Sequence, residues 1–301
     1  MPTAFTVIGL GELIWDLLPT GKQLGGAPTN FAYNAHLLGN DAVVASRIGP
    51  DSLGREAVTR LAQMGLDASF MQRDDAHPTG TVGVTLAANG EPTFAMNEDS
   101  AWDYLTWTPR WAELAARADT VCFGTLGQRA AQARATIDSF LAHTQPRALR
   151  IFDVNLRHSF FTPDMLAASL RHATVVKLNS DELTCVAAML DTGTHGQLQT
   201  ARHLLRAFNL QLVAVTRGAA GSLLVTQTEA IEHAGLRVRC ADTIGAGDAF
   251  AAALAHGLLR SAPLAHISAA ANRIGAWVAT QTGATPPPDA ELLTDVRELL
   301  N

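Results

Sequence analysis

The stretch from residue 242 to residue 250, Asp-Thr-Ile-Gly-Ala-Gly-Asp-Ala-Phe, has residue types whose spacing could do chemistry. Its two glycines, Gly245 and Gly247, stand where an Ala-rich apolar run predicts the start of a buried helix. Backbone N–H groups of Gly245, Ala246 and Gly247 would face outward at the positive end of that helix and bind an anion. Asp248 falls on the first helical turn, where its carboxylate could take a proton from a nearby hydroxyl group. The structural alternative is that Asp248 caps the helix and the glycines form a turn.

A second glycine-rich segment, residues 25–30, reads Gly-Gly-Ala-Pro-Thr-Asn. Pro28 suits the first turn of a helix, and Gly39 is suited to end it. The paired glycines let a ligand approach the backbone closely, and Asn30 can both donate and accept hydrogen bonds toward the same opening. This neutral polar lining suits the hydroxyl groups of a sugar or polyol better than a phosphate. A plain loop before a helix is the structural alternative.

Asp16 is a polar residue within an apolar segment, 12–18, that predicts an extended strand. Its side chain either binds substrate or faces solvent, and the sequence favours neither. Residues 81–87 and 93–96 alternate in polarity around Asn-Gly at 89–90, which is the strongest short-range signal for a β-hairpin. Because this hairpin lies outside the main alternation of strands and helices, it predicts a flap or lid.

The elements that must position these residues alternate regularly after residue 120. Apolar runs of strand length are separated by stretches of helix length, which predicts a parallel sheet covered on both faces. The expected fold class is therefore α/β, with a doubly wound, mostly parallel sheet flanked by helices. The expected strands are 5–9, 42–48, 120–123, 149–154, 174–178 and 211–216, with a hairpin of 223–225 and 230–233. The expected helices are 28–38, 51–64, 130–143, 163–172, 181–189, 200–208, 249–259, 264–280 and 289–300.

Polar residues follow three of the predicted strands, in the segments 153–157, 177–182 and 216–221. The carboxyl ends of parallel strands share one edge of a sheet, and ligands of doubly wound folds bind there. Structural interpretations exist as well, because Asn179 and Glu182 have the spacing of a helix capping box. The three polar strand ends nevertheless converge with the glycine turn on one edge, which indicates a site.

Together these residues suit phosphoryl transfer to a sugar hydroxyl, in which the protein mainly positions the reactants and neutralises charge. Asp248 would accept the hydroxyl proton, and the amides at 245–247 would hold the charge of the phosphoryl group. Magnesium would bridge the phosphates through waters held by Asn179 and Glu182. A Walker loop is absent, because the one Gly-Lys pair, at 21–22, is followed by glutamine.

Two long motifs in this order resemble the signatures of the ribokinase-like (PfkB-type) carbohydrate kinases. The first covers residues 25–32, with Gly39 and Gly49 at the expected places, and the second runs from 242 to 248. The strand ends between them match as well, so the resemblance covers nearly the whole chain.

This resemblance implies a single kinase domain over residues 1–301, with a small β-sheet lid built from about 12–23 and 77–99. It also implies ATP as the phosphate donor, magnesium as the required metal and, as in many members, potassium as a monovalent cation beside the anion hole. Arg157 would contact the transferred phosphate, unless it pairs with a carboxylate such as Asp153. Catalysis is thereby assigned to Asp248, Gly245, Ala246, Gly247 and Arg157, and substrate binding to Asp16, Gly26, Asn30, Arg157 and Asp248. Nucleotide binding is assigned to Lys177, Asn179, Thr216, Gly218, Gly221, Gly247 and Asn272, magnesium to Asn179 and Glu182 through water, and potassium to Asp242, Ile244 and Gly283.

Within the family, residues 25–30 and the Ala-Trp-Asp of 101–103 are most similar to fructokinases, which favours a primary hydroxyl of D-fructose as the acceptor. Ribose, 2-keto-3-deoxygluconate or a nucleoside is the alternative substrate, whereas a phosphorylated sugar would need more cations near the lid than Lys22. A regulator that binds sugar or nucleotide without catalysis is the alternative from another class. Asn34 and His36 have no role that the motifs assign.

Composition sets the broad class of the protein. The chain has 301 residues, 48% of them hydrophobic, and a net charge of −6, so it can bury a sizeable core and lacks the basic blocks of a nucleic-acid binder. Its three cysteines form no disulfide or metal-ligand pattern, which is typical of a reducing compartment. Without a secretion signal or a membrane-spanning run, the sequence predicts a cytoplasmic protein with no membrane partner. Free edges on the lid strands allow a homodimer, and a monomer is equally compatible.

Overall fold

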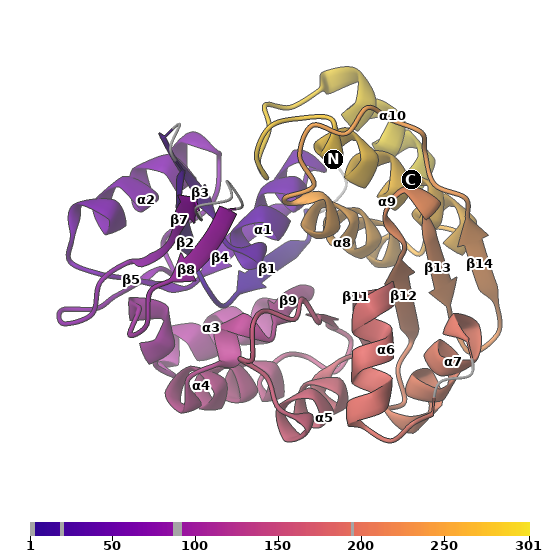
Figure 1. Ribbon diagram of the computed structural model, residues 1–301, viewed down its shortest axis with the longest axis horizontal. Helices are drawn as coiled ribbons and strands as arrows, with labels where there is room; N and C mark the ends of the chain where they lie inside the picture. The colour runs from indigo at the N-terminus through magenta and orange to yellow at the C-terminus, as the bar shows by residue number, and fades with distance from the viewer. Residues whose placement is uncertain (1–3, 19–20, 87–91, 194–195) are drawn as a thin grey trace.

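The computed structural model describes residues 4–18, 21–86, 92–193 and 196–301 (Figure 1). An eight-stranded sheet runs through the molecule in the order β14-β13-β12-β11-β10-β9-β1-β4. The strands from β12 to β4 are parallel, β13 pairs antiparallel with β12, and β14 pairs antiparallel with β13, which confirms the predicted, mostly parallel fold class. The strands are β1 (Thr6–Leu10), β4 (Asp41–Ala45), β9 (Thr120–Gly124), β10 (Leu149–Asp153), β11 (Val175–Asn179), β12 (Leu212–Thr216), β13 (Ser222–Val225) and β14 (Ala230–His233).

Helices cover both faces of this sheet. Successive residues of β1 point to opposite faces, so Val7 lies in one hydrophobic cluster and Ile8 in the other. Strands buried on both faces must be apolar throughout, which explains their continuous apolar runs. The first cluster includes side chains of α1 (Ala27–Leu37), α2 (Ser52–Gln63), α8 (Ala246–Leu259), α9 (Leu264–Ala279) and α10 (Ala290–Leu300). The second includes those of α3 (Pro109–Arg117), α4 (Ala131–Ala142), α5 (Pro163–His172), α6 (Ser180–Met189) and α7 (Gln197–Ala207).

Helix α8 is buried over most of its length. Its residues from Ala249 to Gly257 are all buried, and it packs against α1 and α9. The many alanines let these neighbouring helices approach closely, so α8 is fixed on several sides. None of the described helices has the length and apolar character needed to cross a bilayer.

A separate four-stranded sheet, ordered β3-β2-β7-β8, lies beside α2 in Figure 1. Its β7 and β8 pair antiparallel, which confirms the predicted hairpin, although its Asn-Gly turn at 89–90 lies outside the described residues. Trp102 is fully buried against this sheet, where it clusters with Ile14, Val82 and Leu126. The elements are β2 (Ile14–Leu18), β3 (Gly21–Gly25), β7 (Gly80–Leu86), β8 (Pro92–Met96) and the 3₁₀ helix η1 (Ala101–Tyr104).

The predicted strand over 42–48 is wrong, because the structure divides it in two. Strand β4 ends at Ala45, and β5 (Arg47–Ile48) leaves the large sheet to pair with β6 (Gln72–Arg73). Ser46 Oγ donates a hydrogen bond of 2.6 Å to the carbonyl oxygen of Gly11, where β1 has already ended. Because β1 ends at Leu10, opposite Ala45, no strand remains for Ser46 to pair with, and the chain turns away from the large sheet.

Helix α3 was not among the expected elements. Its signals are nevertheless present, since the Thr108 side chain caps the Trp111 N–H and Pro109 stands at the first helical position. Trp111 and Leu114 are buried on its inner face. The remaining expected helices are present within a few residues of their predicted bounds.

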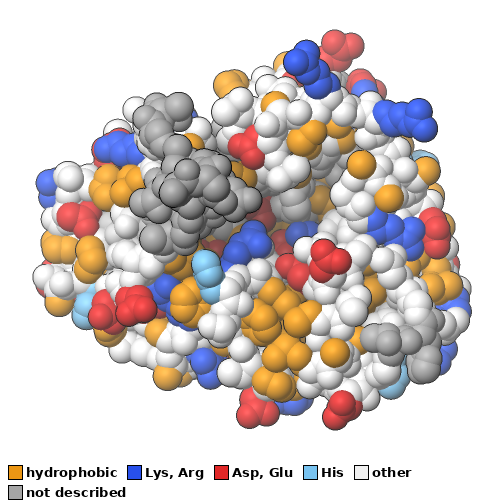
Figure 2. Space-filling view, in the orientation of Figure 1, with side chains coloured by type: hydrophobic (Ala, Val, Ile, Leu, Met, Phe, Trp, Pro, Cys, Tyr) orange, Lys and Arg blue, Asp and Glu red, His pale blue; other side chains and the backbone are white. Residues whose placement is uncertain are grey.

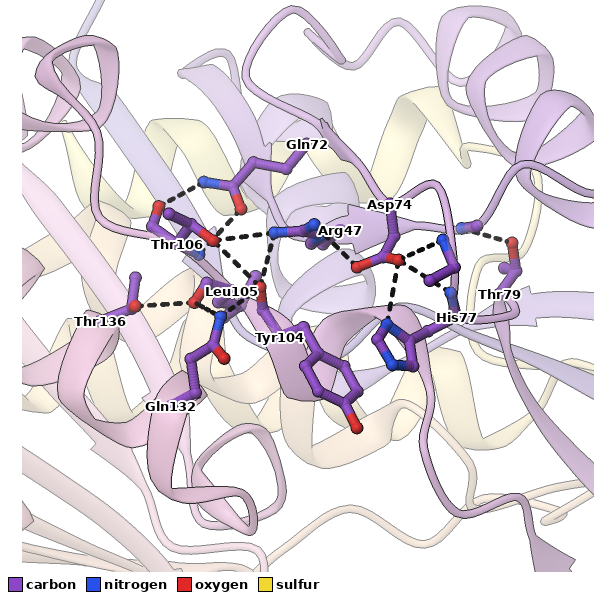
Figure 3. A network of polar contacts seen from close by, with 12 residues as sticks. Arg47, Gln72, Asp74, His77, Thr79, Tyr104, Leu105, Thr106, Gln132 and Thr136 are labelled. Atoms are coloured by element: carbon purple, nitrogen blue, oxygen red, sulfur yellow. Dashed lines mark hydrogen bonds and ion pairs between the residues drawn. The ribbon is translucent and has the colours of Figure 1, made fainter.

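A network of polar side chains joins the two-stranded sheet to η1 (Figure 3). Arg47 Nη1 donates hydrogen bonds of 2.7 Å to Tyr104 O and 2.8 Å to Thr106 Oγ1, and Arg47 Nη2 lies 2.8 Å from Asp74 Oδ2. Asp74 Oδ1 accepts hydrogen bonds from the backbone N–H of His77 and lies 3.0 Å from its Nδ1. The His77 ring stacks on Tyr104 with 3.5 Å between centroids. We refer to these five residues as the Arg47 network, which fixes the chain where it enters β7.

Candidate active site

The mouth of α8 is a turn that only glycine can form. Gly245 precedes the helix with φ at 80°, a left-handed conformation, and a Cβ there would stand 2.6 Å from the Cα of Ala284. The Asp242 carboxylate holds this turn, because Oδ1 accepts the Ile244 N–H at 3.0 Å and Oδ2 accepts the Gly283 N–H at 3.1 Å. The structure thus brings together the three residues that the family resemblance assigned to potassium.

Asp248 and Asn30 meet across the packed helices α8 and α1. Asn30 Nδ2 donates a hydrogen bond of 2.8 Å to Asp248 Oδ2, although the two residues are 218 positions apart in the chain. Burial raises the pKa of Asp248 above its usual value, while Lys177, the Asn30 hydrogen bond and Arg157 favour the charged form. A carboxylate with raised proton affinity in a polar setting suits a general base.

Two polar oxygens near the start of α1 have no hydrogen-bond partner among the described residues, namely Asn30 Oδ1 and Thr29 Oγ1. Asn30 is buried, and the turn before it is tight, because Gly26 has φ at 100° and its Cβ would stand 2.6 Å from Glu12 O. Buried acceptors are normally satisfied, so these oxygens mark a place where a ligand hydroxyl would complete the hydrogen bonding.

Lys177 supplies a positive charge to the same helix mouth. Its Nζ lies 3.0 Å and 3.1 Å from the two carboxylate oxygens of Asp153, and a Cβ on Gly247 would stand only 2.7 Å from it. Burial lowers the pKa of Lys177, but the charges of Asp153, Asp248 and Glu182 outweigh that effect and raise it. A protonated lysine beside the positive end of a helix is suited to hold a phosphoryl group.

Asp16 and Arg157 lie at the edge of the candidate active-site cluster, which consists of Asn30, Lys177 and Asp248. Asp16 on β2 is half-buried, and burial followed by the charge of Asp242 raises its pKa to about 6. Arg157 is exposed on the segment after β10, and its charge partly opposes the rise that burial causes in the pKa of Glu12 and Asp248. Figure 2 shows acidic and basic side chains along the hollow near the middle of this face.

Asn179 and Glu182 form the capping box that the sequence offered as their structural alternative. Asn179 Oδ1 accepts the N–H groups of Asp181 and Glu182, and Glu182 Oε2 accepts the Asn179 N–H at 2.8 Å. Glu182 Oε1 accepts the Leu156 N–H at 3.0 Å. The pair also lines a cavity of about 260 Å³ together with Leu156, Arg157, Asp181 and Cys185.

The other residues assigned to nucleotide binding lie along β12 and beyond. Thr216 ends β12, and Gly218 and Gly221 have φ values of 56° and 84° in the turn to β13. Asn272 is buried on α9, where Nδ2 donates to Ser222 Oγ at 2.7 Å and to the Ser268 carbonyl at 2.8 Å. Its amide group therefore stabilises the packing of α9 on β13.

Glu12 belongs to the cluster and was not among the predicted site residues. Its side chain is 2% exposed, and Oε2 has no hydrogen-bond partner within the described part of the chain. Burial raises its pKa to about 7, and the charge of Asp248 contributes to the rise. The available signal was an acidic residue directly after an apolar strand, between Gly11 and Leu13.

A cavity of about 660 Å³ lies at the other edge of the sheet, beside the amino ends of β1, β9 and β10. Phe5, Asp119, Leu149, Leu258 and Leu259 are among the residues that line it. Doubly wound sheets bind their ligands at the carboxyl ends of the strands, where Asp248, Lys177 and Asn30 converge. The candidate active site is therefore assigned to that edge.

Comparison with known proteins agrees with this geometry. The chain is 30% identical over 300 residues to the fructokinase of Escherichia coli, covering 91% of this chain and 93% of that protein. It is 28% identical over 300 residues to the aminoimidazole riboside kinase of Salmonella typhimurium, covering 93% and 92%. The structure of Vibrio cholerae fructokinase with fructose, ADP and calcium superposes with a TM-score of 0.79 at 25% identity, over 97% of this chain and 98% of that one.

A family model described as pfkB family carbohydrate kinase matches residues 13–291. The match spans the small sheet, the large sheet except β1, and the start of α8, and it includes the site residues described above except Glu12. The chain belongs to the pfkB family of carbohydrate kinases.

Proposed function

We propose that this carbohydrate kinase transfers the γ-phosphate of ATP to a primary hydroxyl of a free sugar, with D-fructose as the preferred acceptor. The observation that carries the proposal is the Asn30–Asp248 hydrogen bond at the mouth of α8, with the Lys177 ammonium against the same helix turn. The fructokinase relative at 30% identity supports fructose, and the ADP in the Vibrio cholerae structure supports an adenine nucleotide.

The sugar hydroxyl would lie between Asp248 and the amides of the helix mouth. Asp248 accepts the hydroxyl proton as the oxygen attacks the phosphoryl group, and Asn30 holds the carboxylate in place through its Nδ2. The free Oδ1 of Asn30 accepts a hydrogen bond from another hydroxyl group of the sugar. Gly26, Asp16 and the small sheet form the rest of the acceptor pocket.

Charge on the transferred group is balanced by the protein. The N–H groups of Gly245 and Gly247 would bind the phosphoryl oxygens at the positive end of α8, and Lys177 and Arg157 add positive charge. The Ala246 N–H, which was assigned the same role, donates a hydrogen bond of 3.3 Å to Thr243 O. Thr216, Gly218 and Gly221 form the nucleotide wall beyond β12, with α9 and its Asn272 behind it. The protein thus positions two reactants and stabilises charge, as phosphoryl transfer requires.

Magnesium and potassium complete the proposed chemistry. Magnesium neutralises the phosphate charge when bound, and Asn179 and Glu182 would hold it through water, since amide and carboxylate oxygens are its preferred donors. Both side chains already accept backbone N–H groups, which fits contact through water. Asp242 with the carbonyls near Ile244 and Gly283 would hold potassium, and a double mutant of the Vibrio cholerae fructokinase has been solved with fructose, ADP and potassium.

A second acceptor class is favoured by one specific observation, the 28% identity to an aminoimidazole riboside kinase. The deciding experiment measures ADP formation with ATP, magnesium and a panel of fructose, ribose, 2-keto-3-deoxygluconate and a purine-like riboside. We expect the highest kcat/KM with fructose. A riboside that exceeds fructose would assign the second class, and no turnover with any acceptor would favour a regulator that only binds.

We also propose that the small sheet closes over the acceptor as a lid. It carries Asp16, and its Gln23 side chain lies against Gly283, where an added Cβ would stand 2.5 Å from Gln23 Oε1. Sugar binding should therefore slow amide hydrogen exchange in β2 and β7, because closure excludes water. Exchange in β12 serves as the internal reference, and unchanged exchange in β2 and β7 at saturating sugar would contradict the closure.

A further inference from the structure

Glu12 is a buried carboxyl group that the proposed mechanism does not use. It lies two residues after the end of β1, at the edge of the sheet where Asp248 and Lys177 lie, and only 2% of it is exposed. Its Oε2 has no hydrogen-bond partner among the residues that the structure describes. Burial of an unpaired carboxylate is costly, so such a group is expected to remain neutral.

The backbone around Glu12 is tightly packed, and glycines stand at the positions where a side chain would clash. A Cβ on Gly127 would stand 3.2 Å from Glu12 Oε2 and 3.0 Å from the Cα of Gly11. A Cβ on Gly26 would stand 2.6 Å from Glu12 O. Glu12 therefore lies between the 3₁₀ helix η2 (Leu126–Gln128) and the turn that opens α1, the helix that presents Asn30.

Three titratable or charged groups face Glu12 from the elements packed around it. These are Asp248 on α8, Arg157 after β10 and the buried thiol of Cys122 on β9. Burial raises the pKa of Glu12 to about 7, Asp248 adds to the rise, and the Ala27 N–H and Arg157 oppose it. Asp248 has more support for its charged form, because Lys177, Asn30 and Arg157 all favour it. The surroundings therefore favour the charged form more strongly at Asp248 than at Glu12.

We propose that Glu12 is a positioning residue of the acceptor pocket, which as a neutral acid holds the first turn of α1 and adds no negative charge next to Asp248 and the transferred phosphoryl group. This inference rests on the proposed function, since it gives Glu12 a part in sugar phosphorylation. Ionised Glu12 places a second negative charge under the turn that carries Asn30. Sugar affinity therefore falls as the pH rises through the neutral range.

The test compares the wild type with Glu12→Gln, which keeps the shape of the neutral acid and cannot ionise. For the wild type, we expect the sugar KM to rise about tenfold between about pH 6 and about pH 8.5, with a smaller change in kcat. Glu12→Gln should keep its low KM across this range. The matched control is Glu56→Gln, because Glu56 is an exposed glutamate paired with Lys22, and it should follow the wild-type profile.

Two outcomes with Glu12→Gln would overturn the proposal. If the variant keeps the wild-type pH profile, the titrating group is another carboxyl such as Asp16 or Asp153. If the folded variant is inactive at every pH, Glu12 acts as a charged group. Glu12→Ala tests the positioning separately: it should raise the sugar KM at both pH values, and a wild-type KM would contradict a positioning role.

A measurement without substrate separates this inference from the proposed function. Infrared difference spectra of the ligand-free protein between about pH 6 and about pH 8.5 should show the loss of a protonated carboxyl band that is missing in Glu12→Gln. Equal spectra for the two proteins would overturn the neutral state of Glu12. A wild type with this band that phosphorylates no sugar would instead overturn the proposed function, and with it the part of Glu12 in sugar binding.

Discussion

The Arg47 network and the candidate active-site cluster shift the pKa values of their buried carboxyl groups in opposite directions. Burial raises the pKa of Asp74, but the N–H groups of Ala76 and His77 and the charge of Arg47 outweigh it and lower the pKa below 3.8. Both Asp74 oxygens have partners. In the active-site cluster burial dominates, so the pKa values of Asp248 and Glu12 are raised.

This difference distinguishes side chains whose hydrogen bonds stabilise the fold from side chains that we expect to bind a ligand. In the Arg47 network the carboxylate is satisfied, and Arg47 Nε is the one atom there without a partner among the described residues. The active-site cluster leaves Glu12 Oε2 and Asn30 Oδ1 unpaired within the same described part. Unsatisfied buried groups reduce stability, and proteins retain them mainly where function requires it.

The largest expected effect comes from removing the base in the active-site cluster. Asp248→Asn keeps the side-chain shape but cannot accept a proton, so we expect kcat to fall about 10³- to 10⁴-fold while sugar and ATP still bind. A coupled assay measures kcat, and calorimetry measures the two affinities. A variant with near-normal turnover would remove Asp248 from the mechanism and make the two clusters alike.

Breaking the Arg47 network should cost stability instead of turnover. Asp74→Asn is expected to lower the free energy of unfolding by about 3 kcal/mol near neutral pH, because Arg47 loses its buried partner. The folded-state pKa of Asp74 lies below its ordinary 3.8, so its stabilisation is present above that value and is lost as the pH falls through the folded-state pKa. Urea denaturation at several pH values measures this, and kcat per folded molecule is the control. A loss of kcat without a loss of stability would contradict the comparison.

The same measurement on Glu12→Gln should give the opposite pH dependence. Protonated Glu12 stabilises the fold fully below its ordinary pKa of 4.5, and this contribution is lost as the pH rises through about 7. Glutamine never ionises, so the variant should gain about 2–3 kcal/mol over the wild type in mildly alkaline buffer and nothing in acid. Equal stabilities in alkaline buffer would show that Glu12 is not held as a neutral acid.

The smallest effect is expected at an exposed ion pair outside both clusters. Lys22 Nζ and Glu56 Oε2 are 2.5 Å apart, but their side chains are 39% and 45% exposed. Glu56→Gln should therefore change the free energy of unfolding by less than about 0.5 kcal/mol, and that change should vanish in high salt. A larger effect would mean that exposed ion pairs contribute as much to the free energy of unfolding as the buried clusters do.

Most of the fold could be predicted because it depends on local pattern. Continuous apolar runs indicated strands buried on both faces, and glycines at 25, 26, 245 and 247 indicated turns that a side chain would block. The structure agrees at Gly245, where both the left-handed φ and the approach of Ala284 exclude a Cβ. The break at Ser46 was not predictable, because it depends on where the neighbouring strand β1 ends.

The candidate site was predictable in its motifs and not in its tertiary contacts. The Lys177–Asp153 pair depends on the register of β10 and β11, which places these two residues opposite each other. The burial of Glu12 depends on Gly127, more than a hundred positions away. Asn272 was assigned to nucleotide binding from the sequence, and its hydrogen bond to Ser222 depends on how α9 packs on β13.

The packing of α1 against α8 has a consequence for synthesis of the protein. Helix α1 leaves the ribosome early, but the helix that covers it and carries Asp248 is made long afterwards. The apolar side of α1 therefore stays exposed on the nascent chain, where chaperones could bind it. Kinase activity should therefore appear only late in translation. In a cell-free system, completed chains should phosphorylate the sugar, and chains that stop before α8 should show no activity.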